Sequence, residues 1–207
     1  MENQSNENKR MTRKQRTIII VSVAVFAAIC LWFGGKYNAL VTAQENVHDA
    51  WAKVESQYQR RADLVPNLVE TVKGYAAHES NVFESVVEAR SKAMQVSFPE
   101  NATEKQLAAY QKAQGELGIA LKSLFALAEN YPDLKASDSF RDLQTQLEGT
   151  ENRIAVARNA YNTAAKDYNV LTRRFPGNIV ASMFGFQKKP YFEAEEGAEK
   201  ATKVSFK

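Results

Sequence analysis

A run of 17 residues without a charged side chain, residues 17–33 (TIIIVSVAVFAAICLWF), constrains the fold of this chain more than any other feature. Extended to Tyr37, the run reaches the ~20 residues with which an α-helix crosses ~30 Å of hydrocarbon. Trp32, Phe33 and Tyr37 gather at its far end, where aromatic rings prefer the lipid–water interface. The sequence therefore predicts a transmembrane helix over residues 17–37.

A cleaved signal peptide and a lipoprotein anchor are the two alternatives for such a run. A signal peptide has a shorter apolar core and then a small-residue cleavage site, but here Ala27 and Ala28 lie in mid-run. A lipoprotein would use Cys30, yet the bulky Ile29 precedes it. Both observations favour a retained anchor. Cys30 is the single cysteine, so no intramolecular disulfide is possible.

Basic side chains are concentrated before the span. Residues 1–16 carry five of the 27 Lys and Arg and two of the 24 Asp and Glu, which leaves 22 of each sign in residues 17–207. Only Lys36 and Lys53 fall within about 20 residues after the charge-free run, and basic flanks stay on the cytoplasmic side. We expect a single-pass protein of the cell (inner) membrane, with residues 1–16 cytoplasmic and the body extracytoplasmic. The neutral body offers no electrostatic basis for binding nucleic acid.

Apolar residues recur after the span at spacings of three and four, the pattern of a seam in a helical bundle or coiled coil. They are Leu40, Ala43, Val47, Ala50, Val54, Tyr58, Ala62, Val65, Leu68, Val72 and Tyr75. The seam begins almost where the span ends, which favours one continuous helix. Similar spacings predict helices over residues 81–96, 103–130 and 137–174, joined by short turns. We therefore predict an all-α chain in which residues 38–174 form an antiparallel bundle of about four long helices.

Pro66 interrupts the first helix of this bundle. Its ring removes the hydrogen bond to the Ala62 carbonyl and crowds that carbonyl. Asp63 could cap a restarted helix, and Asn67 could reach the freed backbone groups. Because the heptad phase continues across Pro66, we expect a kink rather than a loop.

Residues 175–207 begin as an apolar, aromatic segment and end as a polar one. An antiparallel bundle of four helices returns the chain to its starting end, so this segment should lie near the membrane. It either folds over the end of the bundle or forms a membrane-interface or subunit contact, since large exposed apolar patches are uncommon without a partner. The residues concerned are Ile179, Val180, Met183, Phe184, Phe186, Tyr191 and Phe192.

Several separate blocks of the sequence resemble the LemA family, in the family's order and spacing. They are RRADLVPNLVETVKGYAAHE from Arg60, LKSLFALAENYPDLKA from Leu121, the Tyr-Asn steps at 161–162 and 168–169, and FPGNIVASMFGFQKKPYF from Phe175. The resemblance implies one N-terminal membrane helix, a body of long antiparallel helices and no enzyme activity. It implies a loose connection with the bacterial envelope and with membrane proteases. The stretch from Asp63 to Asn67 (DLVPN) matches the family's signature, to which no chemistry is attached.

The strongest metal candidate is the Glu-x-x-His step formed by Glu45 and His48. Di-iron bundles use two such steps with further glutamates, all facing inward. The only other histidine, His78, has Tyr75 three residues before it, so the second step is missing. Val47, rather than Glu45, also lies on the apolar seam. We expect no metal, no cofactor and no catalytic group.

Polar side chains near the seams form the remaining candidate site. Arg61, Glu151, Arg158 and Asn162, with Asp63 and Asn67, are expected to form a buried polar network that sets helix register. The alternative is that they line a small ligand pocket between helices.

These features together predict a non-enzymatic, membrane-anchored scaffold or adaptor of the bacterial envelope. Its expected partners are the lipid bilayer, further copies of the chain as a homo-oligomer, and envelope proteins or membrane proteases. The alternatives are a ligand-sensing or substrate-binding bundle and, more remotely, a metalloenzyme.

Overall fold

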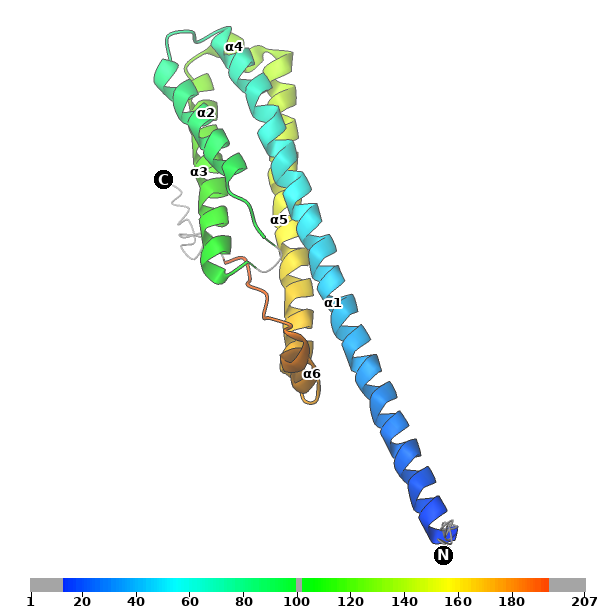
Figure 1. Ribbon diagram of the computed structural model, residues 1–207. Coiled ribbons are helices and arrows are strands. Elements are labelled where there is room, and N and C mark those ends of the chain that lie inside the picture. The colour runs from blue at the N-terminus through cyan, green and yellow to red at the C-terminus, as the bar shows by residue number, and fades with distance from the viewer. Residues whose placement is uncertain (1–12, 100–101, 194–207) are drawn as a thin grey trace, which may run out of the picture.

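The computed structural model describes residues 13–99 and 102–193, and these residues form six helices and no strand (Figure 1). The helices are α1 (Arg13–Lys73), α2 (Ser80–Gln95), α3 (Glu104–Ala128), α4 (Pro132–Ala136), α5 (Asp138–Arg173) and α6 (Gly177–Phe184). This architecture confirms the predicted all-α fold. Most of the basic N-terminal stretch and the polar end of the C-terminal segment lie outside the described residues.

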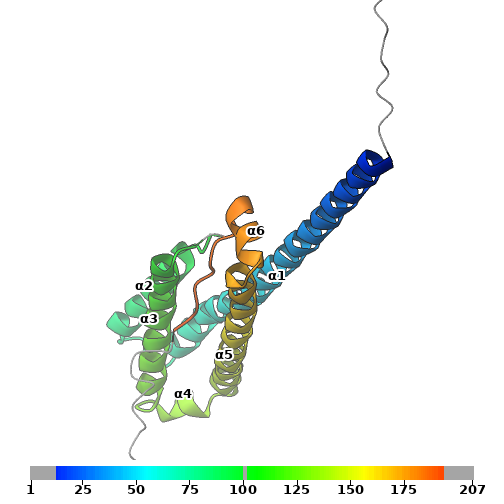
Figure 2. The ribbon, with the colours of Figure 1, turned by 90° about the horizontal axis from the view of Figure 1, so that it is seen from below.

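The helix α1 is 61 residues long and joins the apolar run to the body without a break (Figures 1 and 2). At 1.5 Å per residue it measures about 90 Å. It is long and apolar enough to cross a membrane, and the apolar part is not buried inside the protein. The helix passes through Pro66 with no loop, as the continuous heptad phase predicted.

The body is a bundle of four long helices in which α1 packs along α5 and α2 packs along α3 (Figure 2). The ends of α2, α3 and α5 fall within two residues of the predicted ends. A capping box starts α3: the Thr103 hydroxyl accepts from the Gln106 backbone N–H, and the Gln106 carboxamide oxygen accepts from the Thr103 N–H. The connection between α3 and α5 contains the short helix α4, which the sequence did not indicate.

Almost the whole predicted α1 seam is buried, from Leu40 to Val72. Tyr75 is the exception: it is exposed because α1 ends at Lys73, two residues earlier. The far half of the bundle has an aliphatic core around Leu68, Leu117 and Leu124. The middle of the bundle has an aromatic core, whose rings belong to Trp51, Tyr58, Tyr110, Tyr161, Tyr168 and Phe192.

A third, small core lies where α6 meets α1, beside the end of the apolar run. Leu40 packs there with Val180 and Ala181, and Phe33 and Phe186 cover the contact. The chain thus returns to the end of the bundle next to the apolar run, and from there residues 186–193 run back along the bundle (Figure 1).

Candidate functional site

A buried arginine links the four long helices near the middle of the body. Arg61 of α1 is only 3% exposed. Its Nη1 donates to Glu151 Oε1 of α5 at 2.8 Å, and its Nη2 donates to both oxygens of Gln114 of α3, at 2.7 and 2.9 Å. Gln114 in turn donates to the Ala93 carbonyl of α2 at 3.1 Å. The Arg61 guanidinium also lies 5.1 Å from the centre of the Tyr58 ring.

A second arginine donates a hydrogen bond to the backbone carbonyl that has no donor within its own helix because of Pro66. Arg90 of α2 donates from Nε to the Ala62 carbonyl at 2.8 Å. Because proline has no N–H, this carbonyl lacks its usual partner from residue 66. The group that satisfies the carbonyl is therefore Arg90 of another helix, and the expectation that Asn67 would do so is wrong.

The polar face of the DLVPN motif points outward. Asp63 is exposed and accepts a hydrogen bond from Gln59, one turn earlier, at 2.8 Å. Asp63 and Asn67 line an open hollow together with Gln59, Arg60 and Gln146 of α5. Arg158 does not line this hollow.

The two Tyr-Asn steps hold the C-terminal segment against the bundle. Asn169 pairs with both the N–H and the carbonyl of Lys189, at 2.8 Å each. Asn162 pairs in the same way with Phe192, at 2.9 and 3.0 Å. Each amide thereby satisfies a backbone N–H and a carbonyl that lie outside the helices, as a neighbouring strand would. The tyrosine before each asparagine, Tyr161 or Tyr168, is buried in the core.

The end of the described segment is fixed by two more side chains. Gln111 of α3 donates to the Glu193 carbonyl at 2.7 Å, and Arg158 of α5 donates to the same carbonyl at 2.9 Å. Arg158 also lies 5.0 Å from the centre of the Phe192 ring. Of the six residues predicted as one buried polar network, Arg61 and Glu151 therefore meet each other, and Arg158 and Asn162 bind the C-terminal segment. The remaining two, Asp63 and Asn67, are exposed.

The aromatic core lies beneath this segment and borders a small pocket. Trp51 stacks on Phe192 of the segment, with ring centroids 5.9 Å apart, and meets Tyr161 edge to face at 5.7 Å. The pocket beside Trp51 measures about 150 Å³. Its lining adds polar groups to the rings, among them His48, Glu55 and Lys189.

Burial in the aromatic core disfavours the charged form of the tyrosines. Removal from water, and then the neighbouring Tyr191, raise the pKa of Tyr161 to about 12. Removal from water alone raises the pKa of Tyr168 to about 12, and it is also the largest cause of the raised pKa of Tyr110. All three side chains are therefore neutral packing groups at physiological pH, and none is poised as a general base.

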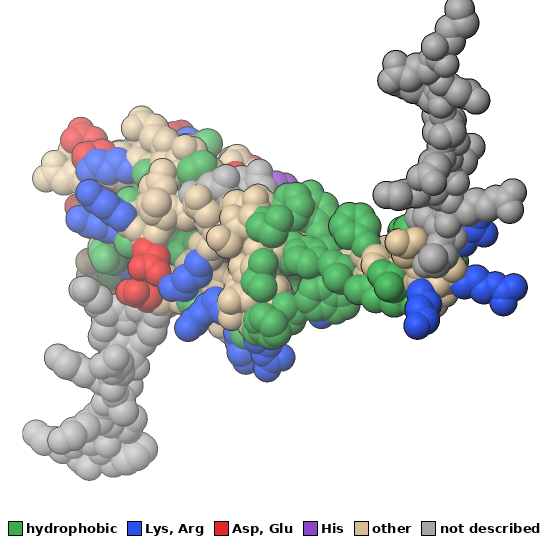
Figure 3. Space-filling model, turned by 60° about the horizontal axis from the view of Figure 1, so that its bottom comes forward, with side chains coloured by type: hydrophobic (Ala, Val, Ile, Leu, Met, Phe, Trp, Pro, Cys, Tyr) green, Lys and Arg blue, Asp and Glu red, His purple; other side chains and the backbone are tan. Residues whose placement is uncertain are grey.

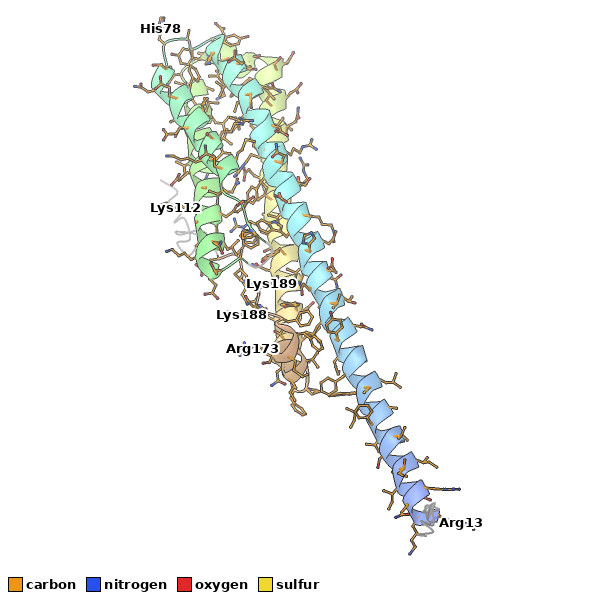
Figure 4. The ribbon with its side chains drawn as sticks, in the orientation of Figure 1. Arg13, His78, Lys112, Arg173, Lys188 and Lys189 are labelled. Atoms are coloured by element: carbon orange, nitrogen blue, oxygen red, sulfur yellow. The ribbon has the colours of Figure 1, made fainter. Side chains whose placement is uncertain are left out.

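The described residues contain no group of three or more His, Cys, Asp and Glu that could hold a metal ion. Glu45 and His48 are both exposed on α1, and His78 lies in the turn before α2 at the opposite end of the body (Figure 4). The structure therefore does not bring the two histidines together.

The apolar C-terminal residues divide into an inner and an outer set. Val180, Ala181 and Phe192 are buried, and Phe186 is half-buried. Ile179, Met183, Phe184 and Tyr191 are exposed, although Phe184 also meets Tyr37 of α1 with ring centroids 4.8 Å apart. Phe33 is half-buried beside α6, whereas Trp32 is exposed and meets Phe33 edge to face at 5.3 Å.

Sequence reasoning missed Gln114, Arg90 and Gln111, three side chains that bind a backbone carbonyl of another element. Each occupies an ordinary polar position in a helical pattern, close to seam residues. Nothing local distinguishes such a residue from one that faces water, because its partner lies far away in the sequence.

Comparison with known proteins places these features in a family. Residues 50–206 match the LemA family. Over 200 residues the chain is 30% identical to magnetosome protein MamQ 1 of Paramagnetospirillum magneticum, a match that covers 88% of this chain and 72% of that protein. It is 28% identical to magnetosome protein MamQ of Magnetospirillum gryphiswaldense over the same shares. It is 22% identical to protein LemA of Metamycoplasma hominis, over 86% of this chain and 76% of that protein.

Proposed function

This chain belongs to the LemA family, and we propose that it is a non-enzymatic, membrane-anchored scaffold or adaptor. Its helical body would act by contacting other proteins, including further copies of the chain. Given the family's setting, we propose that the partners are proteins of the bacterial envelope or membrane proteases.

The observation that carries this proposal is the continuity of α1. One helix supplies both the apolar run and one of the four long helices of the bundle, so no flexible linker separates the anchor from the body. A helix of this kind transmits position and orientation from the bilayer to the body. Such an arrangement suits a protein that presents a surface at a set distance from the membrane.

The polar groups of the body support the same interpretation. Arg61, Gln114 and Glu151 bind one another across helices, and Asn162 and Asn169 bind the chain's own backbone. These groups are used to hold one arrangement of the bundle. Exposed apolar side chains on three helices, Val87, Ile119 and Val156, are available for contacts with partners.

Self-association is tested with the full chain in detergent, by size-exclusion chromatography with light scattering. We expect a protein mass of two or more copies. Contacts in native membranes are tested by a photo-cross-linker at Ile119, with Gln95 at the end of α2 as a second position. A strictly monomeric protein would contradict self-association, and the absence of any protein adduct at both positions would contradict the adaptor role.

The second candidate is a ligand-sensing or substrate-binding bundle, and the pocket beside Trp51 favours it. Its rings suit a small aromatic or apolar group, and His48, Glu55 and Lys189 add polar contacts. A thermal-shift screen of small molecules against the full chain tests this function. We expect a stabilising ligand to lose its effect in His48→Ala but keep it in the distant control His78→Ala. Equal shifts in both variants would contradict binding in this pocket.

A further inference from the structure

The outer face of α6 is the surface that the scaffold function leaves unexplained. In this eight-residue helix Val180 and Ala181 pack inward, while Ile179 and Met183 are 43% and 66% exposed. Phe184 at its end is 58% exposed, and Phe175 just before it is 81% exposed. Four large apolar side chains thus remain exposed within ten residues of chain.

The position of α6 along α1 indicates what covers this face. Phe184 and Phe186 meet Tyr37 with ring centroids 4.8 and 5.8 Å apart, and Phe33 packs on the small core formed by Val180 and Leu40. Phe33 and Tyr37 end the apolar run, whose rings belong at the lipid–water interface. Side chains that touch these two rings lie at the same depth.

The apolar surface is continuous from the span to this level. Figure 3 shows hydrophobic side chains in one unbroken patch, with Lys and Arg side chains at its edges. Arg173 lies beside α6 in Figure 4, whereas the nearby Lys188 is paired with Glu104 of α3 at 3.0 Å. Long basic side chains at the edge of an apolar surface can reach phosphate groups while their stems stay in the acyl region.

We propose that α6 is a second membrane contact, which lies in the bilayer surface and fixes the body against the headgroup–acyl boundary. The proposal rests on the membrane anchor but not on the scaffold function. A second copy of the chain fits this face less well. Four side chains of this size present on the order of 400 Å², about half of the ~800 Å² that each partner buries in a standard interface.

The test uses the full chain with Cys30→Ser and a single labelled cysteine, reconstituted at one copy per phosphatidylcholine nanodisc. The probe is nitrobenzoxadiazole on Met183→Cys, and the matched control is the same probe on Ile119→Cys, an equally exposed apolar position in the body. Nitroxide-labelled lipids, with the nitroxide near the headgroup, act as the quencher. Circular dichroism checks that both variants keep their helix content.

We expect roughly threefold more quenching at Met183→Cys than at Ile119→Cys, because an interfacial helix buries its apolar face in the acyl boundary. The emission of the Met183→Cys probe should also shift to shorter wavelength. Equal quenching at the two positions would overturn the proposal. A shifted but unquenched emission would overturn it too, since protein would then cover the face in place of lipid.

Discussion

At the scale of single residues, Arg61 connects the four long helices through its hydrogen bonds to Glu151 and Gln114 and the bond from Gln114 to Ala93. Its guanidinium is buried, and Glu151 is the carboxylate that compensates it. Removal of the carboxylate leaves the buried Arg61 charge with neutral partners, which is unfavourable, although water can reach the half-exposed Glu151 side. Removal of a carboxylate from an exposed pair has little effect, because water replaces the partner.

We therefore expect Glu151→Ala to lower the free energy of unfolding by about 1–2 kcal/mol, less than for a fully buried pair, because the Glu151 side chain is 48% exposed. Glu88→Ala, which breaks the exposed pair with Lys92, is the matched control and should leave stability nearly unchanged. Thermal unfolding of the full chain in detergent, followed by circular dichroism, measures both. Equal midpoints for the two variants would show that Arg61 does not depend on Glu151.

Arg90 and Pro66 are expected to be energetically coupled. Arg90→Ala leaves the Ala62 carbonyl without a donor, at a cost of about 1–3 kcal/mol. Pro66→Ala restores a backbone N–H in α1 that can bind the same carbonyl. The effect of Arg90→Ala should therefore be smaller in the Pro66→Ala background, which a double-mutant cycle measures. Additive effects of the two substitutions would contradict this account.

The buried tyrosines predict loss of stability in alkali. The pKa of Tyr161 and of Tyr168 is about 12 in the folded chain, against an ordinary value of about 10. The folded state disfavours tyrosinate more than the unfolded state does. The stabilisation that comes from this difference in pKa is fully present below about pH 10, and it is lost as the pH rises to about 12. Replacing both residues by phenylalanine should flatten the fall in thermal midpoint over this range, and an unchanged fall would contradict the assignment.

At the scale of elements, α6 depends on a close approach of backbones. A Cβ at Gly177 would lie 2.4 Å from the Leu171 carbonyl oxygen of α5, which is a backbone atom. The N-terminal end of α6 can therefore pack on α5 only where residue 177 has no side chain. Gly115, in the interior of α3, has open space where its Cβ would be.

Gly177→Ala should therefore lower the thermal midpoint and displace α6, whereas Gly115→Ala should raise stability by up to about 1 kcal/mol through helix propensity. Circular dichroism measures the midpoints. A spin-label distance between positions 37 and 184 measures the docking of α6. Stabilisation by both substitutions would show that α6 is not held by this contact.

At the scale of the whole molecule, the orientation of the body decides where its partners lie. The excess of basic residues before the span predicts a cytoplasmic N-terminus and an extracytoplasmic body. In intact cells carrying Cys30→Ser, a membrane-impermeant thiol reagent should label Val156→Cys on the exposed face of α5. Labelling only after lysis would place the body in the cytoplasm and reverse the predicted topology.

The sequence by itself determined the four long helices of this protein and the buried seam of the first one. The period of the apolar residues identifies α1, α2, α3 and α5 and the α1 seam up to Val72, because burial of one face recurs at each helical turn. The charge-free run likewise marks the part of α1 that is long and apolar enough to cross a membrane. Tyr75 departs from the pattern because the seam alone does not show where the helix ends.

Only the tertiary structure decided how the polar groups are paired. Arg61 meets Glu151 across 90 positions, Arg90 reaches Ala62 across 28, and Asn162 meets Phe192 across 30. The sequence around a polar residue beside a seam is the same whether its side chain faces water or binds a distant carbonyl. Its partner is set by the packing of whole helices, which brings together groups that no sequence spacing relates.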